Sequence, residues 1–189
     1  GNHSLAAAKA CWEEIKRGLT PEETVVHPAR FAMVELENIH DDALRMEPIH
    51  RVLFGCDGDD LLDEIAAFAA AKGATLAAGP QAQEIAVVYE GKEVTLSIEG
   101  SPYKLAVGTL QAFLDGWLSA HPQARLDYIH GEDTVRTLVA GEGAVGFLLP
   151  TPERDRLFDT IRAEGALPRK TFSLGSANEK RYYMECRRL

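Results

Sequence analysis

The sequence predicts an α+β fold, in which a mixed sheet that contains one β-hairpin is covered by flanking helices. Three observations support this class. Residues 84–98 form two alternating apolar segments around Glu90-Gly91, the pattern of a hairpin with one buried face. Residues 61–72 and 107–120 carry apolar side chains at helical spacing. Between residues 125 and 163, strand-like and helical segments alternate, which favours a sheet covered by helices on at least one face.

The elements of the first third follow from capping residues and periodicity. Strong helix formers followed by Gly18 predict a first helix over residues 4–17. Thr20-Pro21 predicts the start of a short second helix, which Pro28 ends. Apolar and partly alternating residues predict one strand over residues 30–39 and a second over residues 49–54.

The later elements alternate in type. Asp57 to Asp60 is an acidic cap for the helix over residues 61–72, and Gly73 ends this helix. Beyond the hairpin and the helix over residues 107–120, we expect strands over residues 125–129, 144–149 and 180–187, and helices over residues 132–140 and 153–163.

Composition narrows the classes of function. The chain has 189 residues, of which 46% are hydrophobic and 26% charged, as in ordinary globular proteins. No apolar run approaches the roughly 20 residues needed to span a bilayer, so we expect a cytoplasmic protein without membrane partners. The three cysteines are too scattered for a disulfide framework. The net charge of −9 argues against nucleic acid as a partner, because that affinity depends on Lys and Arg.

The opening residues Gly1-Asn2-His3-Ser4 stand at the start of the first predicted helix. The unpaired amides and the dipole at a helix N-terminus favour a phosphate or carboxylate group. Asn2 or Ser4 could equally be a simple cap, which is the commoner role of these residue types. His3 supports the functional interpretation, because capping does not require an imidazole, which suits phosphate contact or acid–base work.

Other candidate residues are scattered along the chain. Arg51, Arg169 and Lys170 are candidates for contact with an anion. His40, Asp41 and His50 match no tight metal-binding spacing, so we assign no metal site. The sequence has no Walker loop, no G-x-G-x-x-G and no G-x-S-x-G motif. Residues 168–189 carry six basic side chains against two acids, which fits a charged edge strand, an anion site or a docking strip.

Several segments, taken in order, resemble the bacterial and archaeal domain-of-unknown-function 1015 family. They are Gly1-Asn2-His3-Ser4-Leu5-Ala6, Ala8-Lys9-Ala10, His27-Pro28-Ala29-Arg30-Phe31, Asn38-Ile39-His40-Asp41, Pro48-Ile49-His50-Arg51, Gly146-Phe147-Leu148-Leu149 and Pro168-Arg169-Lys170-Thr171. The order of these segments over nearly the whole chain is more specific than any one of them. In that family the opening element usually lies inside a longer protein.

The opening element also resembles the strand-to-helix phosphate loop of the ParB and sulfiredoxin superfamily, which includes nucleotide-binding partition proteins, an ATP-using sulfinic acid reductase and free-serine kinases. The resemblance implies that Asn2, His3 and Ser4, with the helix amides, contact the phosphates of a nucleoside di- or triphosphate. If the intact protein is a phosphotransferase, we expect His3 and His50 to be catalytic and Arg51, Lys170 and Thr171 to contact phosphate.

The resemblance divides the chain into two expected parts. Residues 1–26 are interpreted as the helical remnant of a truncated N-terminal ParB-like domain, and residues 27–189 as an α+β C-terminal domain. We expect the intact protein to bind a nucleotide or phosphate and to act as a phosphotransferase on a small metabolite, and the fragment to be inactive. The alternative is a non-catalytic scaffold or a domain that forms a homo-oligomer.

Overall fold

The computed structural model describes residues 2–34 and 36–175, with side chains from Ser4 onward. The chain forms two compact units that meet in sequence between Asp41 and Asp42. The predicted boundary between residues 26 and 27 therefore falls within the first unit. The strand expected over residues 180–187 lies outside the described residues.

The regular elements among the described residues of the first unit are helices. It contains α1 (Asn2–Lys16), α2 (Pro21–Val26) and the short 3-10 helix η1 (Pro28–Arg30). The predicted cap of the second helix is confirmed, because the Glu23 amide donates to Thr20 Oγ1 while Glu23 Oε2 accepts from the Thr20 amide.

The strand predicted over residues 30–39 is wrong. Residues 31–34 and 36–38 have no strand assignment, and the apolar side chains there are exposed, Met33 to 95% and Leu36 to 98%. A strand requires a neighbour for its backbone hydrogen bonds. None of the described strand pairings involves this segment, so its apolar alternation has no sheet to join.

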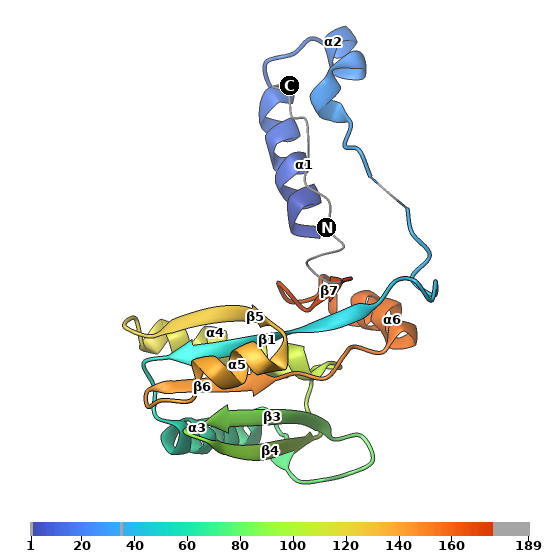
Figure 1. Ribbon diagram of the computed structural model, residues 1–189. Helices are drawn as coiled ribbons and strands as arrows, with labels where there is room; N and C mark the ends of the chain where they lie inside the picture. The colour runs from blue at the N-terminus through green and yellow to red at the C-terminus, as the bar shows by residue number, and fades with distance from the viewer. Residues whose placement is uncertain (1, 35, 176–189) are drawn as a thin grey trace. The chain divides into compact units, whose positions relative to one another are not determined.

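The second unit confirms the α+β class (Figure 1). Its elements are β1 (Met46–Phe54), α3 (Gly58–Ala71), β2 (Thr75–Leu76), β3 (Gln83–Tyr89), β4 (Lys92–Glu99), α4 (Ala106–Ala120), β5 (Arg125–His130), α5 (Glu132–Leu138), β6 (Ala144–Leu148), α6 (Arg154–Glu164) and β7 (Phe172–Leu174). None of the helices in the described part of the chain is long and apolar enough to cross a membrane.

The seven strands found among the described residues form one sheet in the order β2-β4-β3-β6-β1-β5, and β7 pairs with the start of β1. Every described pairing is antiparallel, so the sheet is not the mixed one that the sequence predicted. The alternation of β5, α5 and β6 does make a crossover between two strands of the same direction. However, β1 lies between them and is antiparallel to both, which gives a split βαβ unit.

The β3–β4 hairpin matches its prediction. Tyr89 pairs with Lys92, and the two turn residues Glu90 and Gly91 have φ angles of 48° and 72°. Two successive positive φ angles are typical of the tight turn whose twist fits a two-residue hairpin.

Helices cover both faces of the sheet (Figure 1). On one face, α3 and α4 pack over a large core that includes Leu53, Leu114 and Phe147. On the other face, α5 places Val135 and Val139 against Val52 of β1 and Val88 of β3. Residues 52 and 53 thus face opposite cores, as the alternation of side chains along a strand requires.

The packing of α5 depends on a glycine in β6. A Cβ atom on Gly146 would lie 2.4 Å from a methyl carbon of Val135 and 2.8 Å from one of Val88. These side chains are almost fully buried, so they have little room to move. We therefore expect Gly146→Ala to destabilise the second unit by about 1–3 kcal/mol, the usual cost of overpacking a core.

Urea unfolding followed by circular dichroism measures this change. Gly141→Ala is the matched control, because nothing lies within 4 Å of the added Cβ and the Gly141 φ angle is not positive. Equal stability of the two variants would show that α5 does not pack tightly on β6.

Candidate functional site

Three cationic side chains surround the ring of Tyr128 on β5. The Cζ atom of Arg51 lies 4.8 Å from the ring centroid, Lys170 Nζ lies 5.5 Å from it, and Arg169 Cζ lies 5.8 Å from it. Cations are attracted to the face of an aromatic ring at these distances. We call Arg51, Tyr128, Arg169 and Lys170 the Tyr128 cluster.

The sheet register explains why these residues meet. Arg51 of β1 lies directly opposite Tyr128 of β5, so their side chains leave the sheet on the same face. That face is the one covered by α4, which contributes Gln111 and Asp115. Arg169 and Lys170 come from the loop before β7, more than 100 residues after Arg51 in the sequence.

Arg51 is fully buried and makes hydrogen bonds in several directions. Its Nε and Nη2 donate to Gln111 Oε1 at 3.4 and 3.3 Å. Nη1 donates to the carbonyl of Lys170 at 2.9 Å and to that of Ile49, and Nη2 donates to the carbonyl of Arg169 at 3.0 Å. Arg51 therefore fixes the backbone of the loop that carries the other two cations.

Burial also affects the charge of Arg51. Removal from water lowers the pKa of its guanidinium from 12.5 to about 10. The group still carries its proton at neutral pH. It thus acts as a buried positive charge beneath the exposed part of the cluster.

Arg169 and Lys170 bring positive charge to the surface. Arg169 Nε donates to Tyr128 Oη at 2.6 Å, and Arg169 Nη2 lies 3.1 Å from Asp115 Oδ1. The side chain of Arg169 is nevertheless 56% exposed. Three cations with one contacting carboxylate give a local positive charge on a chain whose net charge is −9. Such a site favours a phosphate or carboxylate group.

Two of the residues predicted to bind phosphate, Arg51 and Lys170, lie together in this cluster. Their environments differ, because Arg51 is buried against protein acceptors while Lys170 is exposed. Thr171 is buried, and its hydroxyl donates to the carbonyl of Pro168 at 2.6 Å. Arg51 and Thr171 thus shape the loop, and Lys170 is the one of the three with its charged group at the surface.

His50 lies on the opposite face of the sheet from Arg51. It is 2% exposed, and its Nδ1 accepts a hydrogen bond from the Leu149 amide at 3.1 Å. Burial lowers its pKa below the ordinary value of 6.5. The structure therefore places this predicted catalytic residue beside β6 and away from the Tyr128 cluster.

The predicted phosphate loop lies in the first unit. The helix α1 begins at Asn2, two residues before the predicted start at residue 4, and Ser4 is exposed. The side chains of Asn2 and His3 are outside the described ones. Their roles remain predictions.

Sequence reasoning missed Tyr128, Gln111 and Asp115. Tyr128 lies in a predicted strand and Gln111 and Asp115 in a predicted helix, where polar and aromatic residues are ordinary. Only the register of β1 with β5 and the position of α4 bring them to Arg51, and no local pattern encodes that pairing.

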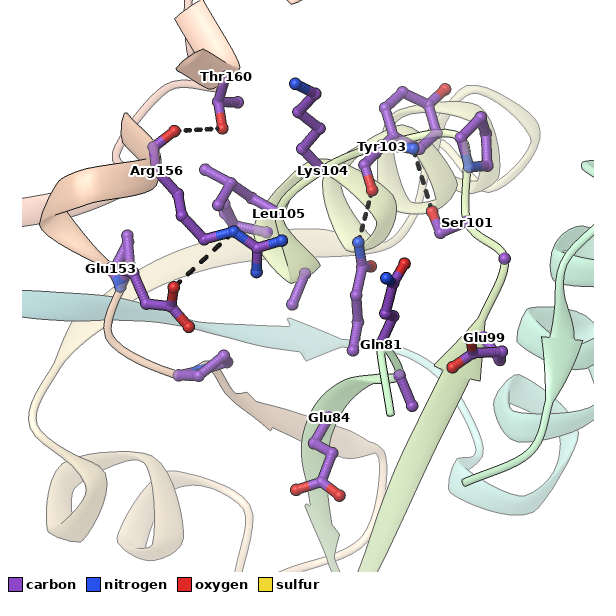
Figure 2. A pocket seen from close by; sticks show the side chains of 18 of the residues that line it. Gln81, Glu84, Glu99, Ser101, Tyr103, Lys104, Leu105, Glu153, Arg156 and Thr160 are labelled. Carbon is purple, nitrogen blue, oxygen red and sulfur yellow. Dashed lines mark hydrogen bonds and ion pairs between the residues drawn. The ribbon is translucent and has the colours of Figure 1, made fainter. Parts of the chain in front are cut away.

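A cleft of about 790 Å³ opens at the start of α4 (Figure 2). Two of its lining residues are hydrogen-bonded to each other, because Gln83 Nε2 donates to the Tyr103 carbonyl at 2.5 Å, and Gln83 Oε1 accepts from Thr109 Oγ1 at 2.5 Å. Its charged lining residues are Glu84, Glu99, Lys104, Glu153, Arg156 and Asp159. Because acids outnumber bases there, the cleft is less suited to a phosphate than the Tyr128 cluster.

Comparison with known proteins shows the family. The family described as "Protein of unknown function (DUF1015)" matches residues 1–117, which is more than half of the chain. The chain therefore belongs to this family. No curated protein matches the sequence.

Solved structures share the fold at low sequence identity. A free serine kinase in complex with AMP is 15% identical, with a TM-score of 0.50 over 74% of this chain and 57% of that chain. A variant of a free serine kinase in complex with ADP is 16% identical, with the same TM-score and coverage. A conserved hypothetical protein from Pyrococcus furiosus is 13% identical, with a TM-score of 0.50 over 75% of this chain and 60% of that chain. The chain thus spans less than two thirds of each of these proteins.

The buried, neutral state of His50 predicts a dependence of stability on pH. Because its pKa is lower in the folded protein, the unfolded chain binds the proton first as pH falls below 6.5. The contribution of His50 is therefore complete above pH 6.5 and is lost as pH falls toward the folded-state pKa, by at most about 1.4 kcal/mol per pH unit.

Urea unfolding between about pH 7.5 and pH 5.5 measures this slope. His50→Asn keeps an acceptor for the Leu149 amide but does not titrate, so its free energy of unfolding should fall less steeply with decreasing pH. Parallel slopes for the wild type and His50→Asn would contradict the neutral state of His50.

Proposed function

We propose that the protein binds a nucleotide or another phosphate-bearing metabolite, and that the whole protein is a phosphotransferase acting on a small metabolite. The observation that carries this proposal is the Tyr128 cluster. There, the cations of Arg169 and Lys170 reach the surface from a loop whose backbone is held by the buried Arg51.

The chemistry of phosphoryl transfer fits such a site. The transferred group carries negative charge on several oxygens, and catalysis consists mainly of positioning it and stabilising that charge. Arg169 offers a planar fork and Lys170 a point charge, and both suit phosphate oxygens. Their fixed backbone lowers the cost of ordering them when a ligand binds.

The comparisons support the choice of ligand. Structural neighbours are named as free serine kinases in complex with AMP or ADP. ADP and ATP are therefore the first phosphoryl donors to test, and L-serine is the first acceptor. The helix N-terminus at Asn2, His3 and Ser4 adds a second proposed phosphate contact, in which His3 would act as an acid–base group.

The alternative is a scaffold or oligomerisation domain. The exposed apolar side chains of Phe31, Met33, Val34 and Leu36 favour it, because exposed apolar patches often mark contact surfaces. A scaffold would not be stabilised by small phosphate-bearing ligands. Nucleotide binding therefore separates the two functions.

Thermal unfolding of the chain with AMP, ADP, ATP and CTP tests the proposal. A ligand that binds the folded state and is present at 100 times its Kd adds about 2.7 kcal/mol to the free energy of unfolding. We expect at least one of these nucleotides to raise the Tm. We expect Arg169→Gln to weaken that nucleotide's binding by about tenfold or more, because a charge-assisted contact to phosphate is lost.

Arg162→Gln is the matched control. Arg162 is also an exposed arginine beside a carboxylate, Asp159 at 3.9 Å, but it lies on α6 outside the Tyr128 cluster. No change in Tm with any of these nucleotides or with inorganic phosphate would overturn the proposed function. Equal loss of affinity in Arg162→Gln and Arg169→Gln would show that binding depends on net charge and not on the cluster.

A further inference from the structure

A histidine–carboxylate pair lies next to the Tyr128 cluster. His130 Nε2, at the end of β5, lies 2.5 Å from Glu47 Oε2, near the start of β1. Both side chains are about one third exposed, at 36% and 37%. The proposed function assigns no role to either residue.

The sheet register places this pair on the same side as the cluster. Tyr128 pairs with Arg51 and His130 with Ile49, so Tyr128 and His130 project from the same face of β5. Two residues along a strand are separated by about 7 Å. His130 is therefore the next side chain along that face from the ring that holds the three cations.

The pair leaves one imidazole nitrogen available. Nε2 faces Glu47, and among the described residues no protein group forms a hydrogen bond with Nδ1. While His130 is neutral, the carboxylate of Glu47 adds negative charge beside the cluster. When His130 gains a proton, the imidazolium cancels that charge and Nδ1 becomes a donor.

Other charged groups lie on the strands and helices around His130. His50 of β1 interacts electrostatically with both His130 and Glu132 of α5. The charge of Glu132 raises the pKa of His50, and that of His130 lowers it. On the face of β5 that carries Tyr128 and His130, the charged groups in printed contacts with the Tyr128 ring or with Arg169 are Arg51, Arg169, Lys170 and Asp115 of α4.

We propose that His130, held by Glu47, is a fourth and titratable basic residue of the anion site, so that a phosphate group binds more tightly when His130 is protonated. This inference rests on the proposed function, because it assumes that the Tyr128 cluster binds the phosphate of a nucleotide. It extends that function by naming a residue that makes affinity depend on pH in the range where histidine titrates.

The test measures the Kd of AMP, inorganic phosphate and sulfate at about pH 8 and about pH 6, for the wild type and His130→Gln. Gln keeps a hydrogen-bonding group for Glu47 but carries no charge. Sulfate is a dianion at both pH values, so its affinity reports on the protein alone. Comparing AMP with inorganic phosphate shows whether the nucleoside contributes to binding.

We expect the wild type and His130→Gln to bind equally at the higher pH. At the lower pH the wild type should bind about 3–10 times more tightly than His130→Gln. This is the effect expected in a partly screened site for one added charge on a residue about 7 Å along β5 from Tyr128. His121→Gln, a change of the same kind at the end of α4, should behave as the wild type.

The outcomes separate this inference from the proposed function. If an anion binds and the wild type and His130→Gln show the same pH dependence, the inference is wrong and the proposed function stands. If none of the three anions binds at either pH, both are wrong. Circular dichroism at each pH verifies that all variants remain folded.

Discussion

The guanidinium of Arg51 lies inside the second unit and links three separate parts of the chain: β1, α4 through Gln111, and the loop that carries Arg169 and Lys170. A buried charge is costly unless every donor finds an acceptor. Here the acceptors are an amide oxygen and backbone carbonyls, and among the described residues no carboxylate contacts the guanidinium directly, although Asp115 lies near enough to raise its pKa. The positive potential of Arg51 therefore remains and adds to that of the exposed cations.

The same hydrogen bonds explain the unusual backbone of the loop. Lys170 has a φ angle of 52°, in the left-handed region that costs a residue with a side chain about 1 kcal/mol. The Lys170 carbonyl accepts a hydrogen bond from Arg51 Nη1. The hydroxyl of the next residue, Thr171, donates to the carbonyl of Pro168. These contacts offset the strain. They hold the loop in the conformation that places Arg169 and Lys170 around the Tyr128 ring.

Local sequence patterns predicted much of the fold and little of the site. The Glu90-Gly91 turn and the Asp57 cap are encoded by adjacent residues, so they could be identified directly. The strand predicted over residues 30–39 failed because alternation alone cannot supply a neighbouring strand. Arg51, Arg169 and Lys170 could be identified as candidates for anion contact from their residue type, whereas Tyr128 could not, since only long-range register brings it to them.

The central claim is that Arg51 fixes the loop on which the anion site is built. Hydrogen exchange of the loop amides tests it without any ligand. In Arg51→Lys, which keeps the charge but cannot reach several acceptors at once, the amides of residues 169–174 should exchange about tenfold faster or more, while those of the β3–β4 hairpin keep their protection. Unchanged exchange at residues 169–174 in Arg51→Lys would contradict the account.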